Sequence, residues 1–367
     1  MAAPGSRYRP PGPLPAGQPV KIRLFNLVTS TCSVAAPEPV HDAMGHYLDP
    51  YAVAALRQPD MTLAVSSDIS AVSDARRLLG GRRPLATRVS HPQQRYHSWA
   101  TAGVGQLLLP ESDPDHVINV TGNRVLVTAA RPGVAATIGT RVVRQFIMRG
   151  GEARGGRCVH AAVAAIDGEG VLIGGHPGAG KTSVLTHLIE RHGARPVAND
   201  RVVLVPVTGR GWHAIGVPLA WRFTPQAVSG SPTLTAGLAV REPSRGRDLV
   251  DGKAELTPRE VSWLLNAPAM PATRITRVVI LARSPAGPLP VSPDAAFVRR
   301  QLGFGGADLF AGDWLGIRPG FSRAADPLPA GEWWEALAAT LPVQVVSWAE
   351  PGEFPRLAAT VSGGGPS

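Results

Sequence analysis

Alternation of apolar and polar residues over the first third of the chain predicts β-strands. The segment KIRLFNLV from Lys21 alternates as a half-buried strand does, and MTLAVS at 61–66 is a second strand candidate. HVINV (116–120) and RVLVTAA (124–130) flank the turn signal at 121–123, and this pattern predicts a β-hairpin. The first third of the chain is therefore expected to be rich in β-structure.

The pattern changes beyond residue 134, where apolar strands alternate with helical periodicity. Helices are predicted at 135–148, 182–191, 294–302 and 330–341. Apolar runs predict buried strands at 158–166, 171–175, 195–198, 201–207, 277–283 and 343–349. Strands interleaved with helices are typical of an α/β domain.

These elements divide the chain into four parts. A disordered Pro/Gly tail at 1–20 precedes a small β-rich N-terminal module at 21–134. An α/β domain is expected over 135–350, and a flexible tail over 351–367. Within the α/β domain, the polar stretch 231–260 is broken by Gly and Pro and is expected to be a long loop or mobile flap.

Length and composition agree with two folded domains. The chain has 367 residues, of which 44% are hydrophobic and 17% charged, so it can bury a sizeable core. Two cysteines, Cys32 and Cys158, support neither a disulfide framework nor a cysteine zinc site. No apolar run is long enough for a membrane span, and the N-terminus has no signal-like segment. We expect a cytoplasmic protein with no membrane partner.

The net charge of +10 does not by itself indicate a nucleic-acid partner. The arginines are scattered, and no run of five like charges occurs. Lysine stands only at positions 21, 181 and 253, so 34 of the 37 basic residues are arginine. A lysine that is retained despite this bias towards arginine is therefore of particular interest.

One of the three lysines lies in a phosphate-binding loop motif. The run Gly175-His176-Pro177-Gly178-Ala179-Gly180-Lys181-Thr182 fits G-x-x-x-x-G-K-[ST], and Ser183 completes the expected nucleotide-binding set. A predicted strand precedes the motif and a predicted helix follows it, as this chemistry requires. Backbone N–H groups and the helix N-terminus would bind phosphates, Lys181 would reach the β- and γ-phosphates, and Thr182 would ligate Mg²⁺. ATP and Mg²⁺ are the expected cofactors.

The residues around the loop are more particular than the loop itself. Val159-His160-Ala161 precedes it, and Ala198-Asn199-Asp200-Arg201-Val202 follows one helix later. This order resembles the catalytic core of the HPr kinase/phosphorylase family, over residues 158–207. The resemblance implies a P-loop kinase domain that phosphorylates a hydroxyl group. The acceptor is a peptide, a protein or a small molecule, and a homo-oligomer is compatible with the sequence.

Three side chains receive candidate roles from this resemblance, each with a structural alternative. Asp200 accepts the hydroxyl proton, helps Thr182 to hold the metal, or only caps a turn between two strands. His160 orients Asp200, touches phosphate, or is a buried core histidine. Arg201 pairs with phosphate, with Asp200, or in a structural salt bridge.

The sequence also departs from the family pattern. Asn199 stands where the family has its first Asp, and 216–222 lacks the family's glutamate. HPr itself is therefore not the expected substrate. Two other functions stay open: a non-catalytic nucleotide-binding regulatory module, and an assembly ATPase or GTPase, although neither N-K-x-D nor a strand ending in Asp-Glu is present. In the flap, Arg241, Arg245, Arg247 and Lys253 would face either the phosphoryl group or solvent.

Overall fold

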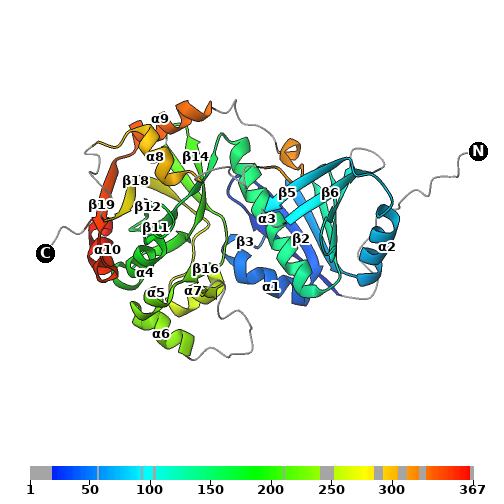
Figure 1. Cartoon of the computed structure of the whole chain (residues 1–367), viewed down its shortest axis with the longest axis horizontal. Coiled ribbons are helices and arrows are strands. Elements are labelled where there is room, and N and C mark those ends of the chain that lie inside the picture. The colour runs from blue at the N-terminus through cyan, green and yellow to red at the C-terminus, as the bar shows by residue number, and fades with distance from the viewer. Residues whose placement is uncertain are drawn as a thin grey trace, which may run out of the picture. The chain divides into compact units, whose positions relative to one another are not determined.

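The computed structural model shows a mixed α/β protein made of two compact units (Figure 1). It describes residues 19–55, 58–91, 94–101, 105–209, 211–239, 252–284, 292–304, 312–321 and 328–363. One unit consists of Met1–Gly150 and Leu309–Ser322, the other of Gly151–Asp308 and Arg323–Ser367. Across these described ranges, no helix has the length and apolar character needed to cross a membrane.

A nine-stranded sheet forms the first unit, in the order β3-β1-β2-β4-β9-β8-β7-β6-β5. Its strands are β1 (Val20–Asn26), β2 (Thr31–Pro37), β3 (Ala52–Val53), β4 (Met61–Ser67), β5 (Ala86–His91), β6 (Gln94–Ala100), β7 (Gly105–Pro110), β8 (His116–Thr121) and β9 (Arg124–Ala129). Its helices are α1 (Glu38–Leu48), α2 (Ile69–Leu79) and α3 (Pro132–Ala153), with a 3-10 turn at Asp49–Tyr51. Strands β2, β4 and β9 run parallel, and the other pairs are antiparallel.

The predicted hairpin is confirmed, because β8 and β9 pair antiparallel around the turn. The predicted helix 135–148 is longer at both ends and forms α3, which begins at Pro132. A Cβ on Gly139 of this helix would lie 3.1 Å from Met44 and from Val65, so α3 packs closely on α1 and β4. This packing ties most of α3 to the first unit, and the division between the units falls after Gly150.

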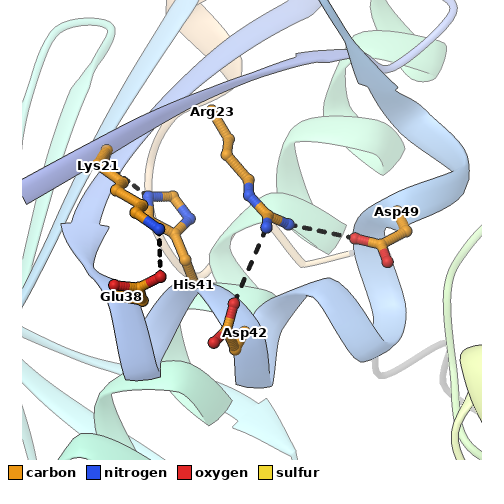
Figure 2. A network of polar contacts seen from close by, with 6 residues as sticks. All are labelled: Lys21, Arg23, Glu38, His41, Asp42 and Asp49. Atoms are coloured by element: carbon orange, nitrogen blue, oxygen red, sulfur yellow. Dashed lines mark hydrogen bonds and ion pairs between the residues drawn. The ribbon is translucent and has the colours of Figure 1, made fainter.

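A polar network joins β1 to α1 on the surface of the first unit (Figure 2). Its members are Lys21, Arg23, Glu38, His41, Asp42 and Asp49. The guanidinium of Arg23 lies 3.3 Å from a carboxylate oxygen of Asp49 and 3.9 Å from one of Asp42. Such exposed pairs stabilise little, because water screens them. The imidazole of His41, which is buried, donates from Nε2 to the carbonyl of Lys21 at 2.7 Å and fixes α1 on β1 more firmly.

A second polar group lies inside the same unit, where three side chains form a chain of hydrogen bonds. Nδ1 of His116 is 2.6 Å from the Asp115 carboxylate, which can only accept, so this nitrogen carries the proton. Nε2 of His116 then accepts from the hydroxyl of Tyr96 at 2.9 Å. The ring of Trp314 stacks on Tyr96, with 4.9 Å between centroids. Burial lowers the pKa of His116, although Asp115 opposes the shift, and the ring is therefore neutral.

This arrangement predicts that the first unit loses stability in mild acid. The pKa of His116 is lower in the folded state than its ordinary value of 6.5, so the unfolded chain takes up the proton first. Its contribution is fully present above about pH 6.5 and is lost as the pH falls toward the folded-state pKa. Urea unfolding of the wild type should show this fall, whereas His116→Gln should reduce the slope by up to ~1.4 kcal/mol per pH unit. An unchanged slope would contradict the assignment, and His192→Gln is the control.

The second unit is built on an eight-stranded sheet, in the order β10-β14-β15-β18-β12-β11-β13, with β19 also paired to β18. Its strands are β10 (Arg157–His160), β11 (Ala162–Ile166), β12 (Glu169–Gly174), β13 (Arg195–Ala198), β14 (Arg201–Val207), β15 (Gly211–Gly216), β18 (Ala272–Arg283) and β19 (Val343–Trp348). A separate hairpin pairs β16 (Trp221–Phe223) with β17 (Ala254–Leu256). The helices are α4 (Lys181–His192), α5 (Pro225–Ser229), α6 (Pro232–Ala239), α7 (Pro258–Leu264), α8 (Ala295–Leu302), α9 (Ala330–Thr340) and α10 (Phe354–Ser362), with 3-10 turns at Arg318–Gly320 in the first unit and Pro351–Glu353 in the second.

Two predictions for this unit are wrong in part. The run 158–166 is not one strand, because the chain breaks at Ala161, and β10 and β11 pair with different partners. The expected flap 231–260 contains α6, β17 and the start of α7, anchored by the buried Leu234 and Val261. A capping box between Thr257 and Glu260 starts α7, a local signal that the polar composition obscured. Lys253 is exposed, and Arg241, Arg245 and Arg247 lie outside the described residues.

The expected flexible tail at 351–367 is wrong for residues 351–362. They form a 3-10 turn and then α10, which lies beside α4 (Figure 1). Its buried residues are Phe354, Leu357, Ala358 and Val361. This spacing places them on one face of a helix, and that face packs into the same core as α4. Helix α10 therefore helps to support the loop before α4.

Candidate functional site

The direction of the strands brings distant segments of the second unit to one edge of its sheet. Strand β11 is antiparallel to both β12 and β13, so β12 and β13 point the same way and end at the same edge. In the register of the sheet, Ile173 lies opposite Ala162 and Val163 lies opposite Ala198. The loop after β12, the residue before Ala161 and the turn after β13 therefore meet at this edge. Strand pairing therefore brings together segments that lie far apart in the sequence.

The loop between β12 and α4 has the backbone that its glycines permit. Gly175, Gly178 and Gly180 have φ values of 135°, 83° and 91°, a region that L side chains rarely adopt. His176, Pro177 and Gly178 are exposed at its tip. Helix α4 begins at once with Lys181, and no side chain caps its N-terminus. The first amides of α4 therefore keep their positive potential for an anion.

Lys181 is buried under this loop, with 7% of its surface exposed. Its Nζ donates to the carbonyl of Gly175 at 2.7 Å and to that of His176 at 3.2 Å. Burial lowers the pKa of Lys181 to about 8, and the charge of Asp200 partly offsets this. The hydrogen bonds to these two carbonyl groups do not neutralise the buried ammonium, and a phosphate group would compensate its charge.

The turn between β13 and β14 carries the acid of the site. His160 Nε2 donates to Asp200 Oδ1 at 3.1 Å, and the Asp200 carbonyl accepts from the Ala161 amide at 3.1 Å. Burial tends to raise the pKa of Asp200, but the His160 hydrogen bond and the charges of His160, Arg201 and Lys181 lower it overall. The carboxylate is therefore ionised at neutral pH, with 44% of the side chain exposed. His160 is thus in contact with Asp200 and is more than a core residue.

The remaining predicted residues divide between the loop and its surroundings. Thr182 and Ser183 lie in the first turn of α4 and are half-buried. Asn199 is 5% exposed, and its amide donates to the carbonyl of Ala220 at 3.2 Å, which fixes the turn. Arg201 is buried, with its guanidinium carbon 5.6 Å from the centroid of the Phe304 ring. Asn199 is therefore held by the backbone, and Asp200 is the acid of this turn.

Two side chains near the loop carry oxygen atoms of the kind that Mg²⁺ takes as ligands. The residues that would hold the metal are Thr182, through its hydroxyl, and Asp200, through its carboxylate. No group of three or more His, Cys, Asp or Glu side chains arranged for a metal occurs in the described part of the chain. Mg²⁺ usually reaches such sites with phosphate oxygens and waters, and needs only one or two protein ligands. The donor set fits that mode of binding.

Several residues that support the loop were not predicted from the sequence. The carbonyl of Gln301 accepts from the Gly175 amide at 3.3 Å, and its side chain lies 3.2 Å from His176 Nε2. The indole of Trp348 donates to the Ala179 carbonyl at 2.9 Å. Phe304 stacks on His160. These residues come from α8, from the chain after it and from β19, and no local motif indicates their role.

The close approach of α10 gives a test of the loop geometry. A Cβ on Gly180 would collide with the ring of Phe354, whereas one on Gly178 would meet no atom within 4 Å. Both glycines have positive φ, so alanine at either position costs about 1–2 kcal/mol. Gly180→Ala should lose roughly 1–3 kcal/mol more in unfolding free energy than the matched Gly178→Ala, because overpacking adds to backbone strain. Equal losses in urea unfolding would show that α10 does not restrain the loop.

The comparisons with known proteins place little constraint on this site. No family model and no curated protein matches the chain. Among solved structures, the chain is similar to the Hpr(Ser) kinase/phosphatase from Coxiella burnetii, at 18% sequence identity. The match covers 38% of this chain and 73% of that one, with a TM-score of 0.24. The resemblance is weak and partial and carries no argument of its own.

Proposed function

We propose that this protein is a P-loop kinase of the HPr-kinase-like type, which transfers the γ-phosphoryl group of Mg-ATP to a hydroxyl group. One observation carries the proposal: the pairing of β11 with β12 and β13 brings the turn with the His160–Asp200 pair to the same edge of the sheet as the loop over the buried Lys181. A phosphate loop by itself is evidence for nucleotide binding but not for phosphoryl transfer. A carboxylate at the same edge of the sheet adds a group that can act on an acceptor.

Nucleotide binding follows from the loop. The residues that would bind the phosphates are Gly175, His176, Pro177, Gly178, Ala179, Gly180, Lys181, Thr182 and Ser183. The tip of the loop is exposed, and the Lys181 ammonium lacks a direct carboxylate among its described hydrogen-bond partners. Phosphate oxygens would supply negative charge next to the buried Lys181 ammonium. When bound, Mg²⁺ would supply further charge neutralisation.

The acid of the site suits the transfer step. A bond forms between the acceptor oxygen and the γ-phosphorus, the bond from that phosphorus to the β–γ bridging oxygen breaks, and the hydroxyl loses its proton. Asp200 is ionised, so it can accept a hydrogen bond from the hydroxyl and receive that proton. His160 holds the carboxylate through Oδ1 and leaves its other oxygen for the acceptor or the metal. The use of ATP favours the cytoplasm as the place of the reaction.

A second function is favoured by one specific residue. Asn199 stands where the family that the sequence resembles has an acid, and its amide is engaged with the Ala220 carbonyl. A site with a single carboxylate is also compatible with a module that binds nucleotide and regulates a partner without transferring phosphate. This alternative predicts nucleotide affinity with no transfer to any acceptor.

The deciding experiment follows the label of [γ-³²P]ATP with Mg²⁺ into separate pools of Ser- and Thr-containing peptides, proteins and small hydroxyl compounds. The proposal predicts label in one pool, in a bond stable to acid as a phosphate ester is. Nucleotide binding measured by calorimetry, with label in none of the pools, would instead favour the regulatory module. Absence of both binding and transfer would overturn both functions.

A further inference from the structure

We propose that Phe304 is a positioning residue that braces the His160–Asp200 pair, a role that rests on the proposed kinase function. The ring of Phe304 lies 5.8 Å from the imidazole of His160 between centroids, with an angle of 17° between the planes. The guanidinium carbon of Arg201 lies 5.6 Å from the centroid of the same Phe304 ring. One aromatic ring thus contacts the two residues that flank Asp200 in space and in sequence.

Strand register explains how one ring reaches both side chains. His160 and Arg201 are directly opposite each other in the antiparallel pair of β10 and β14. Residues directly opposite project to the same face of a sheet, with their Cβ atoms about 4.5–5.5 Å apart. A ring placed over that face restricts both side chains together. Stacked rings and cation–π contacts each favour one orientation of the groups involved.

The position of Phe304 is itself fixed by the helix before it. Helix α8 is anchored by the buried Val298 and Leu302, which belong to the same core cluster as Val159 of β10. Gln301, in the last turn of α8, accepts the Gly175 amide of the phosphate loop. Gln301 at the end of α8 therefore contacts the phosphate loop, and Phe304, just after the helix, contacts the acid–imidazole pair. This arrangement sets the distance between the two halves of the site.

The chemical consequence concerns the orientation of Asp200. Among the described residues, the side chain of Asp200 is held by His160 Nε2, and the imidazole can rotate unless its faces are held. Stacking on Phe304 holds the ring plane and hence the direction of the Nε2–H bond. Loss of the ring should therefore lower the rate of transfer without weakening nucleotide binding, because Gln301 makes the contact of this segment with the phosphate loop and is left in place. Misplaced catalytic groups commonly cost about 10- to 100-fold in rate.

The test compares Phe304→Leu, which keeps most of the bulk but removes the aromatic face, with Phe304→Tyr, which keeps the face. Phe304→Leu should lower kcat about 10-fold or more with KM for ATP within about twofold, and Phe304→Tyr should retain the wild-type kcat. Phe297→Leu is the matched control, since Phe297 is a half-buried phenylalanine within α8 and contacts Arg300. Equal kcat values for Phe304→Leu and the wild type would overturn the inference, as would equal losses in Phe304→Leu and Phe304→Tyr.

A second measurement needs neither nucleotide nor activity. In protein labelled with ¹³C in its histidine rings, the His160 signal is assigned by its absence from His160→Gln. Stacking shields protons above an aromatic ring, so the His160 resonance should move downfield in Phe304→Leu and stay in place in Phe297→Leu. An unmoved resonance would refute the brace even if the protein is a kinase. A downfield shift in a protein that transfers no phosphate would uphold the brace and refute the kinase proposal separately.

Discussion

Lys181→Ala is expected to weaken the binding of Mg-ATP about 100-fold, because it removes a charge-assisted contact in a buried site. Lys181 is 7% exposed, and the described partners of its ammonium are the carbonyl groups of Gly175 and His176. Phosphate oxygens would replace weak acceptors by charged ones, so most of the affinity should depend on this side chain. Isothermal titration calorimetry of the variant against the wild type measures the loss directly.

Two controls separate a loss of charge from a loss of fold. Lys21→Ala removes an exposed lysine that pairs with Glu38 in the first unit, and it should leave nucleotide affinity unchanged. Lys181→Arg keeps the charge but places a larger, planar group in a buried space, so it should not restore full affinity. Binding by Lys181→Ala at the wild-type Kd would refute the phosphate site.

Binding of the nucleotide is also expected to depend on pH through Lys181. Burial lowers the pKa of Lys181 to about 8 in the free protein, and a bound phosphate would stabilise the charged form. Affinity should therefore be constant below about pH 8 and should fall above it, by up to about tenfold per pH unit. The sign follows because the bound form must take up a proton that the free lysine has lost. A Kd that is flat from pH 7 to pH 9.5 would contradict this role of Lys181.

Asp200→Asn is expected to lower the rate of phosphoryl transfer by about 10³-fold while nucleotide binding is retained. Asparagine can still accept the hydrogen bond from His160 through its Oδ1, so the turn after β13 should keep its conformation. It cannot accept a proton, and it binds Mg²⁺ more weakly than a carboxylate does. The Kd of the nucleotide should stay close to the wild-type value, because Lys181 and the loop amides are unchanged.

The measurement is a split between rate and binding in the same preparation. Label transfer to the acceptor gives the rate, and calorimetry gives the Kd of the nucleotide. Asp74→Asn is the control. Asp74 is an exposed residue of α2 in the first unit, where it pairs with Arg77. Transfer by Asp200→Asn at the wild-type rate would remove Asp200 from the chemistry and leave only a structural role in the turn.

Elements whose signal is local could be predicted from the sequence. The strand, glycine loop and helix around Lys181 are encoded within about 25 neighbouring residues, and the structure forms them as β12, the loop and α4. The hairpin of β8 and β9 likewise depends on a local signal, the turn at 121–123. Helices α1 and α2 were not predicted. Met44 of α1 packs against Gly139 of the distant helix α3, whereas α2 has a local start signal, because the Asp68 carboxylate accepts from the amides of Ser70 and Ala71.

The sequence by itself determined the candidate phosphate loop and the identity of the acid that follows one helix later. Only the tertiary structure decided that His160 meets Asp200, that α10 closes behind Gly180, and that Phe304 lies against the site. The physical reason is that loop conformation and capping depend on near neighbours, whereas these contacts depend on the pairing of strands such as β11 with β12 and β13. That pairing is settled by how the whole sheet buries its apolar faces.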